Sequence, residues 1–484
     1  MKRYRLHIWP VWLLLGMMFL AACQSDALPE VETGSGQQAT VRRDSSYINL
    51  RIVNSNATMT RAVETATAAE NAVYDGILCI FEGADETSAT LKTAVVIDQL
   101  VNNPGNSTSI DITQRLATDT HAYGSKLFVL ALLNTTSTGF KVSGNDLLFN
   151  GVSQKQKDNG CTIHDIQNLV IHSVGSTKEH VGLFMSNAPQ DGYIMPEIPS
   201  NCLYDTETLA ATGNRLTINV ERAAARVKVT NAATQIRNIR LNPRNGDSET
   251  RHPNVHKITW SLNHYNTQSY AIRTGFTAED NWATSINNLT SFTAKDFSLY
   301  PQQSYSQDAV YIGENTTETE TEVIVEVQLK DNSNMLMHEC FVFHPYQNDY
   351  LENAYHDLFT SPEQYIAYLR DELPPENKGW FGLAGTDNAE IFKYATVKID
   401  ANGNVVFSLK NSDFTPEQQE SLNEFAAFLS NHTTGFRDGK MYYTYKINHD
   451  TTHGNGVVRN NAYNLTFVDN DVRQSMSAIG RPKP

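Results

Sequence analysis

Alternating apolar and polar residues predict the first regular element of the chain. In residues 46–53 the side chains of Ile48, Leu50 and Ile52 fall on one face of an extended strand, and the intervening side chains fall on the other. This period of two predicts a β-strand with one buried face. The following segment, 54–69, is rich in Ser, Asn, Thr, Ala and Glu with few apolar residues, which predicts an exposed loop.

Similar short runs predict that most of the chain is β-structure, with turn signals such as Asn-Gly between them. The other strands are expected at 74–83, 126–133, 169–172, 216–229, 255–265, 308–314, 321–330, 335–343, 394–400, 404–409 and 441–449. A break in the alternation at 210–214, together with a length of 484 residues, favours two domains. We expect an N-terminal domain over 46–214 and a C-terminal domain over 215–484.

Two helices are predicted inside the second domain from their N-terminal caps. SPEQYIAYLRDEL begins with Ser361, and TPEQQESLNEFAAFLSN begins with Thr415; both have Pro at the first helical position and Gln two residues later. Leu422, Phe425 and Leu429 form an apolar stripe on the second helix, joined by Phe428, which predicts core packing rather than a groove for a partner. The pattern therefore predicts a mainly β protein of two antiparallel β-sandwich domains, the second with a short helical insertion.

The first 23 residues have the order of an export signal. Lys2, Arg3 and Arg5 are basic, and the apolar run 11–20 is too short to span a bilayer of about 30 Å. The run ends in Leu-Ala-Ala-Cys, which resembles the lipobox of bacterial lipoprotein signals, in which the thiol of Cys23 receives the lipid. The alternative is an ordinary signal peptide with an incidental cysteine. Residues 24–45 are polar and aperiodic, and they predict a flexible tether.

Charge and cysteine usage exclude some classes of protein. Asp and Glu exceed Lys and Arg by 53 to 38, and no basic block follows the N-terminus, so nucleic acid is not an expected partner. Cys79 and Cys340 lie in apolar strand-like runs and are expected to be buried thiols. Cys161 and Cys202 lie in loop-like sequence and could pair, although four cysteines allow three pairings.

The sequence lacks the motifs of common enzyme sites. It contains no phosphate-binding glycine loop, no GxSxG elbow and no HExxH. His449 and His453 are four residues apart, but they lie in a predicted hairpin loop rather than on a helix, so no metal site or cofactor is expected. We therefore expect a structural or binding protein and no enzyme. Tyr-rich stretches such as 262–270 leave glycan binding as an alternative.

On these residues the chain resembles the FimA-type fimbrillins, the two-domain pilins of type V pili in Bacteroidota, which include major and minor fimbrium subunits and accessory tip and anchor proteins. The resemblance covers nearly the whole mature chain and implies transthyretin-like β-sandwich domains. It is carried by the lipobox followed by SYINLRIV and a loop with Arg61, by VERAAARVKV at 220–229, by VHKITW and AVYIGENTTETETEVIVEV, and by GVVRNNAYNLTF at 456–467.

The resemblance implies an assembly mechanism. Such pilins are exported as outer-membrane lipoproteins, and an arginine-specific protease cuts after an arginine in the first loop. Here the cut would fall between Arg61 and Ala62 and would remove the lipid on Cys23 together with the strand that buries Ile48, Leu50 and Ile52. A strand from a neighbouring subunit then fills the open groove. The alternative for Arg61 is an ordinary solvated loop residue.

One departure from the family concerns the end of the chain. Stalk subunits carry further strands after the Tyr-anchored strand, whereas residues 468–484 contain no alternating apolar segment. We therefore expect an accessory subunit at the tip of a cell-surface fimbrium, with adhesion and virulence as its role. The expected partners are other fimbrial subunits, the protease and a receptor on a host or bacterial surface. A lipid-retaining anchor, a stalk subunit and a glycan-binding surface lipoprotein stay as alternatives.

Overall fold

The structure is a computed structural model. It describes residues 46–54, 66–98, 100, 109–116, 125–156, 160–177, 181–190, 192–237, 239–244, 250–273, 289–291, 303–304, 309–343, 356–373, 378–401, 403–450 and 454–467. All of these belong to one compact unit, Arg43–Pro484. The export signal 1–23 with Cys23, the tether 24–45, the proposed cut between Arg61 and Ala62, and residues 468–484 lie outside the described residues.

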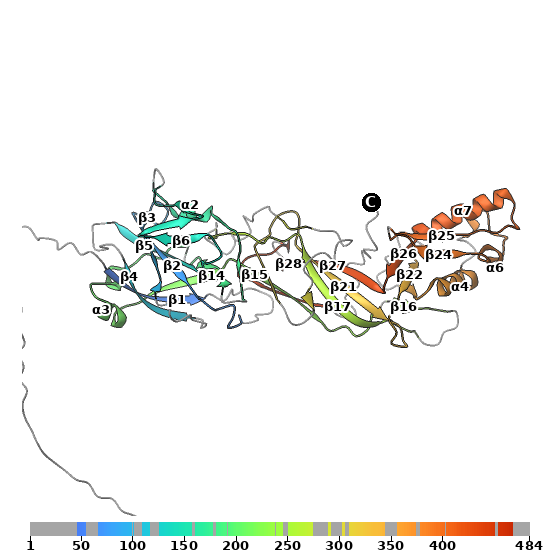
Figure 1. The fold of residues 1–484 in the computed structure, drawn as a ribbon, viewed down its shortest axis with the longest axis horizontal. Coiled ribbons are helices and arrows are strands. Elements are labelled where there is room, and N and C mark those ends of the chain that lie inside the picture. The colour runs from blue at the N-terminus through green and yellow to red at the C-terminus, as the bar shows by residue number, and fades with distance from the viewer. Residues whose placement is uncertain are drawn as a thin grey trace, which may run out of the picture. The chain divides into compact units, whose positions relative to one another are not determined.

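The prediction of a mainly β fold is confirmed, as Figure 1 shows. The strands before residue 223 are β1 (Ser46–Asn54), β2 (Gly76–Gly83), β3 (Thr90–Val96), β4 (Ser109–Leu116), β5 (Lys126–Leu133), β6 (Phe140–Ser143), β7 (Asp146–Phe149), β8 (Val152–Ser153), β9 (Val170–Ile171), β10 (Gly175–Ser176), β11 (Gly182–Leu183), β12 (Met185–Asn187), β13 (Leu203–Tyr204) and β14 (Leu216–Arg222). The helices that the structure describes in full in this part are α2 (Ile163–Gln167), the 3-10 helix η1 (Ser200–Cys202) and α3 (Glu207–Thr212).

The strands after residue 223 are β15 (Ala225–Asn231), β16 (Ile239–Leu241), β17 (Asn254–Asn263), β18 (Ser269–Tyr270), β19 (Gln303–Ser304), β20 (Val310–Ile312), β21 (Glu322–Lys330), β22 (Glu339–Phe343), β23 (His356–Phe359), β24 (Thr396–Ile399), β25 (Val405–Ser408), β26 (Thr433–Arg437), β27 (Lys440–Lys446), β28 (Asn448–Asp450), β29 (Gly454–Asn455) and β30 (Ala462–Phe467). Among the described residues, the helices given with both ends in this part are α4 (Pro362–Glu372), α6 (Asn388–Ile391) and α7 (Pro416–Asn431).

The first part is organised around one eight-stranded sheet, in the order β13-β1-β14-β12-β5-β2-β3, with β4 paired to β1. Its central strands are buried on both faces. On β2, for example, Ile77 and Cys79 pack into one hydrophobic cluster, whereas Leu78 and Ile80 pack into another. The second cluster also receives side chains from β1, β4 and β14, so the two ends of the sheet close around the same core.

The sheet membership of β14 corrects the predicted strand arrangement. Residues 216–229 were expected to form one strand at the start of the second domain. Instead, β14 ends at Arg222, Ala223 and Ala224 separate it from β15, and β14 pairs with β1 and β12 in the first sheet. Strand pairing therefore changes between β14 and β15, later in the chain than residue 215. The division into two domains stays a prediction.

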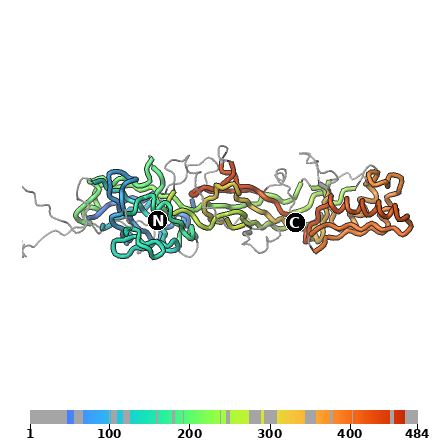
Figure 2. Tube along the Cα trace, turned by 90° about the horizontal axis from the view of Figure 1, so that it is seen from above, coloured from blue at the N-terminus to red at the C-terminus, as the bar shows by residue number. Residues whose placement is uncertain are grey.

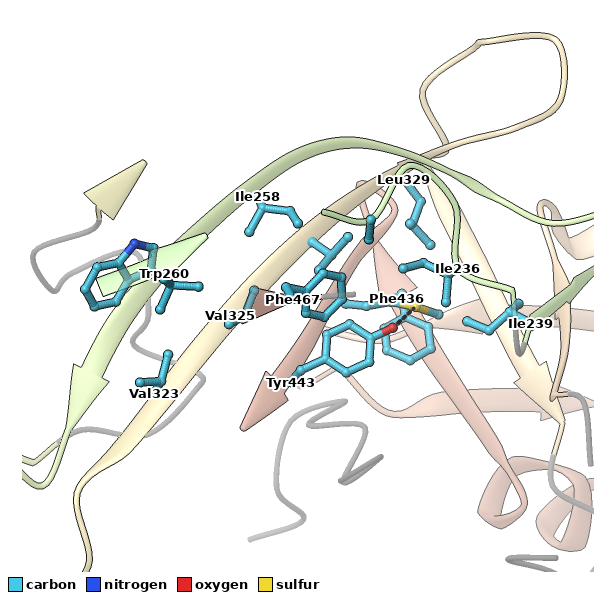
Figure 3. Packing of buried hydrophobic residues seen from close by; sticks show 14 of the residues in the cluster. Ile236, Ile239, Ile258, Trp260, Val323, Val325, Leu329, Phe436, Tyr443 and Phe467 are labelled. Atoms are coloured by element: carbon cyan, nitrogen blue, oxygen red, sulfur yellow. Dashed lines mark hydrogen bonds between the residues drawn. The ribbon is translucent and has the colours of Figure 1, made fainter. Parts of the chain in front are cut away.

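Two of the sheets in the second part face one another across a common core. The sheets have the orders β20-β15-β30 and β19-β17-β21-β27. Figure 3 shows this core, in which the ring of Phe467 from the first sheet lies 5.3 Å from the ring of Tyr443 from the second. Trp260 and Val325 from the second sheet belong to the same cluster. The arrangement is that of a sandwich, in which the inward faces of two sheets bury each other's side chains.

The two parts repeat one topological feature. In each of them the first strand pairs in parallel with the last, β1 with β14 and β15 with β30. In each, the other edge of the first strand pairs antiparallel, β1 with β4 and β15 with β20. Figure 2 shows the consequence: the blue start of the described chain lies among green segments, and red segments lie among yellow-green ones.

The helical insertion has its own hydrophobic cluster, which includes residues of α4, α6, α7 and β22–β25. Both predicted helices are confirmed, because Ser361 and Thr415 accept hydrogen bonds from the backbone N–H of Gln364 and Gln418. Leu422, Phe425 and Leu429 are buried, as predicted. Caps of this kind fix a helix start with local contacts alone, which explains why the sequence located both helices.

All four described cysteines are free and buried, so the Cys161–Cys202 pair that the sequence allowed is not formed. Burial raises the pKa of the Cys79 and Cys202 thiols, and it raises the pKa of Cys340 to about 12. These thiols are therefore protonated at neutral pH and act as small apolar side chains.

Candidate functional site: the position of the first strand

Strand β1 occupies an interior position of the first sheet. On one side, Ser46–Val53 pair antiparallel with β4. On the other side, Leu50–Asn54 pair in parallel with β14, and Tyr47 and Ile48 pair with β13. We call this position, bounded by β4 and by β13 and β14, the β1 slot. Among the described residues β4 has no sheet partner other than β1.

The predicted apolar face of β1 is confirmed to be buried. Ile48 and Leu50 are completely buried, and Ile52 is 2% exposed. They pack in one cluster with Ile112 from β4 and Ile218 from β14. Burial of such a side chain contributes roughly 1.5–3 kcal/mol. The β1 slot is therefore lined with apolar side chains on its inner face.

The outer face of β1 holds a buried polar residue, Asn49, whose burial the alternating pattern does not predict. Asn49 is 1% exposed, donates to the carbonyl oxygen of Gly213 (3.2 Å) and accepts from Nε of Arg215 (3.1 Å). Helix α3, which ends just before Gly213, lies against β1 and covers this face. An alternating strand gives no local signal of such a cover, because the covering segment lies more than 150 residues away in the chain.

A charged cluster joins the three strands at the outer face. Arg51 of β1 makes a bidentate pair with Asp111 of β4 (2.7 and 3.0 Å), and Arg215, next to β14, contacts the same carboxylate at 2.7 Å. The hydrogen bond from Arg51 and the charge of Arg215 lower the pKa of Asp111. The cluster is about half exposed, so we expect it to favour one pairing more than to stabilise the fold.

The end of β1 is tied to residues that follow the segment containing Arg61. The side-chain amide of Asn54 donates to Oδ1 of Asn71 (2.8 Å), and Arg222 at the end of β14 donates to the same oxygen (2.6 Å). Arg222 also donates to the backbone carbonyl of Glu70 (3.0 Å) and to Oδ1 of Asn460 (2.9 Å). The chain beyond residue 65 is therefore bound to β14 independently of β1.

Three buried ion pairs involve these residues or their neighbours in the chain. Arg226 contacts Glu70 at 3.1 Å, Arg273 donates to Glu221 at 2.9 Å, and Arg459 contacts Glu314 at 2.9 Å. We call these six residues with Arg222 the buried ion network. Burial raises the pKa of Glu221, opposed by the charges of Arg273 and Arg459, and burial lowers the pKa of Arg222.

The motifs that carried the family resemblance meet in the buried ion network. Glu221, Arg222 and Arg226 come from VERAAARVKV, Arg459 comes from GVVRNNAYNLTF, and Glu314 comes from the segment between them. Arg459 is 1% exposed and also donates to the Ser269 hydroxyl and the Tyr270 carbonyl. The alternation of these segments predicts strands, but it does not predict their ion pairs.

Tyr463 in β30 contacts residues that precede its own strand in the chain. The hydroxyl of Tyr463 in β30 accepts the backbone N–H of Val458 (2.9 Å) and lies 2.8 Å from Nδ1 of His449. His453 lies outside the described residues. Within the part of the chain that the structure describes, no group of three or more His, Cys, Asp or Glu could hold a metal ion.

Within the ranges that the structure describes, none of the helices is long and apolar enough to cross a bilayer.

Fold and slot together define a mainly β protein whose first strand completes the core of its first sheet. No family model and no curated protein matches the chain. Among solved structures, it is similar to a candidate cell adhesion protein from Parabacteroides distasonis (16% identity, 59% of this chain, 76% of that chain, TM-score 0.34). It is also similar to a candidate cell adhesion protein from Bacteroides eggerthii (14%, 60%, 77%, TM-score 0.32) and to a fimbrial assembly protein from Parabacteroides distasonis (13%, 59%, 84%, TM-score 0.30).

Proposed function

We propose that the protein is a non-enzymatic structural and adhesive subunit of a cell-surface fimbrium, made as a lipoprotein and assembled by strand exchange. The observation that carries the proposal is the position of β1. This first described strand fills an interior slot of its sheet, and the segment that joins it to the rest of the chain contains Arg61. A single cut after Arg61 would separate β1 from the remainder of the fold.

Loss of β1 would open a site suited to another strand. It would expose the apolar face formed with Ile112 and Ile218, and it would leave backbone groups unpaired on both β4 and β14. Unpaired strand edges next to an apolar groove bind an added strand through main-chain hydrogen bonds. The vacated slot would be filled by a strand from a neighbouring subunit.

The contacts after Arg61 support retention of the rest of the chain. Glu70 and Asn71 are held by Arg226 and Arg222, and those contacts do not involve β1. A chain that begins at Ala62 would keep its new N-terminal segment bound to β14 and β15.

The lipid and the tip position involve residues that the structure does not describe. We propose that Cys23 carries the lipid that attaches the precursor to the outer membrane until Arg61 is cut by an arginine-specific protease. We propose further that the cleaved chain, which would receive a strand in the β1 slot, lies at the tip of the fimbrium. A chain that kept Cys23 would instead be an anchor.

The test is the N-terminus of the protein in fibres isolated from cells that produce it. We expect a chain that starts at Ala62 and carries no lipid. An Arg61→Ala variant should keep its acylated Cys23 and stay out of the fibres, whereas the matched control Arg43→Ala, altered before β1, should be processed normally. Fibre-associated protein that is still acylated at Cys23 would contradict cleavage and the tip position.

A further inference from the structure

The apolar face of β1 does not by itself fix how far a strand is inserted into the slot. Ile48, Leu50 and Ile52 are two residues apart, and side chains on a strand return to the same face every two residues. A shift by two residues would still point apolar side chains into the core. Some other contact must therefore determine the register.

Asn49 distinguishes these registers. Its side chain is buried between the carbonyl of Gly213 and the guanidinium of Arg215, which both belong to the wall of the slot. A two-residue shift would put Tyr47 or Arg51 at this place. Space is limited there, because Asn49 is only 1% exposed at this place. Neither Tyr47 nor Arg51 could take the place of the Asn49 amide unless the segment that covers it moved.

Arg51 adds a second discriminating contact that shares a partner with the first. Asp111 accepts from Arg51, and Arg215 contacts both Asp111 and Asn49. Asp111, Arg215 and the Gly213 carbonyl belong to β4 and to the segment before β14, so they would stay in the slot when β1 leaves. The slot thus offers two binding positions that lie two residues apart along the strand that fills it. One is the carboxylate of Asp111, and the other is the Gly213 carbonyl together with Arg215.

We propose that the β1 slot selects an incoming β-strand of another polypeptide by two polar positions. This strand carries a side-chain amide at the position of Asn49 and a basic residue at the position of Arg51, between apolar residues that replace Ile48, Leu50 and Ile52. The inference rests on the proposed strand exchange and deepens it by naming the chemistry of the donor.

The second part of the chain offers an internal comparison. Strand β15 lies between an antiparallel and a parallel partner, as β1 does, and its run Val227-Lys228-Val229 repeats the apolar, basic, apolar order of Leu50-Arg51-Ile52. At the position matching Asn49, however, β15 has Arg226, which binds Glu70. We therefore expect the amide to set the β1 slot apart from a slot of the β15 type.

The experiment uses the full chain with one site for a sequence-specific protease inserted within 55–65, cut after folding so that β1 stays bound without a covalent link. Fluorescent peptides of residues 45–54 are then exchanged into the slot. We expect the unaltered peptide to bind, and Asn49→Leu to bind at least about tenfold more weakly, because the Gly213 carbonyl and Arg215 lose their partner. Arg51→Glu should bind more weakly by an amount that falls with added salt. The control peptide Val53→Thr, altered on the same outer face, should bind within about twofold of the unaltered one.

The outcomes separate the two proposals. If the unaltered peptide binds and Asn49→Leu binds equally well, selection by the amide is wrong, but strand exchange stands. If no peptide displaces β1, strand exchange itself is contradicted, and donor selection with it.

A second measurement tests the amide contact without exchange. In the uncut full chain, Asn49→Leu should lower the unfolding temperature although leucine is more apolar, whereas Val53→Thr should change it little. An Asn49→Leu chain that is at least as stable as the unaltered protein would overturn the selective role of Asn49.

Discussion

At the scale of single residues, the middle of β1 is buried on both of its faces. Ile48, Leu50 and Ile52 are buried because their spacing of two matches the strand period. Asn49 lies between them and is buried by contacts with Gly213 and Arg215, far along the chain. Contacts between residues so far apart leave no periodic pattern in the sequence. The meeting of Asn49 with Gly213 and Arg215 could therefore not be predicted from the alternation.

Arg459 gives a residue-scale prediction. Its guanidinium is completely buried against Glu314, so Arg459→Met would leave a carboxylate in the interior without a cation. We expect a loss of about 3–5 kcal/mol in the free energy of unfolding, measured by urea denaturation. The double variant Arg459→Met/Glu314→Gln should recover part of the loss. A control, Arg370→Met at the exposed pair with Asp371, should change stability little.

Asp111 gives a pH-dependent prediction. Its pKa is lowered in the folded state by the hydrogen bond from Arg51, so the unfolded chain binds its proton at higher pH than the folded chain does. The stabilising effect is therefore complete above the unfolded value of about 3.9 and is lost as the pH falls through the lower folded value. The difference in unfolding temperature between the protein and Arg51→Ala should be present at pH 7 and vanish in acid. In an Asp111→Asn background, a difference of the same size at pH 7 would speak against this pair.

At the scale of elements, the helices were predictable and the strand partners were not. The caps of α4 and α7 involve residues three apart, whereas β1 pairs with β4 and β14, about 60 and 166 residues away. Strand β4 was missed because its alternation, Ile110 and Ile112 among polar residues, is short. Strand β14 was found but assigned to the following part, since a strand pattern does not state its neighbour.

The pairing of β4 predicts how the sheet responds when β1 is removed. Because β4 has no other described sheet partner, its amides at 109–116 should lose protection from hydrogen exchange once β1 is cut and stripped away. Amides of β14 facing β1 should lose part of theirs. The β2–β5 pair, which does not contact β1 through its ladder, serves as the internal control. Unchanged protection of β4 would contradict an interior role for β1.

At the scale of the whole molecule, the buried apolar side chains form several separate hydrophobic clusters. The cluster of the helical insertion contains Phe425, and the cluster around the β1 slot contains Leu50. The helical caps predicted that an insertion exists, but its own core depends on β22–β25, whose packing the sequence pattern did not specify.

Separate cores predict separable effects of substitution. Phe425→Ala should destabilise the insertion by about 3–5 kcal/mol, seen as faster hydrogen exchange in α7. Binding of the 45–54 peptide in the β1 slot should stay unchanged. Glu424→Ala, altered on the exposed side of the same helix, is the control. Weaker binding of the 45–54 peptide by the Phe425→Ala variant would show that the two cores are coupled.

The parallel pairing of first and last strands also bears on the order of folding. During synthesis the chain emerges from its N-terminus, so β1 and β4 can meet early, but the opposite edge of β1 has to wait for β13 at residue 203 and for β14 after it. Contacts over such separations are slow to form because loop closure must come first. In both parts of the molecule the final ladder closes only when the last strand has appeared. The opening strand of each sheet is thus paired on at most one edge until the partners of its other edge have been made.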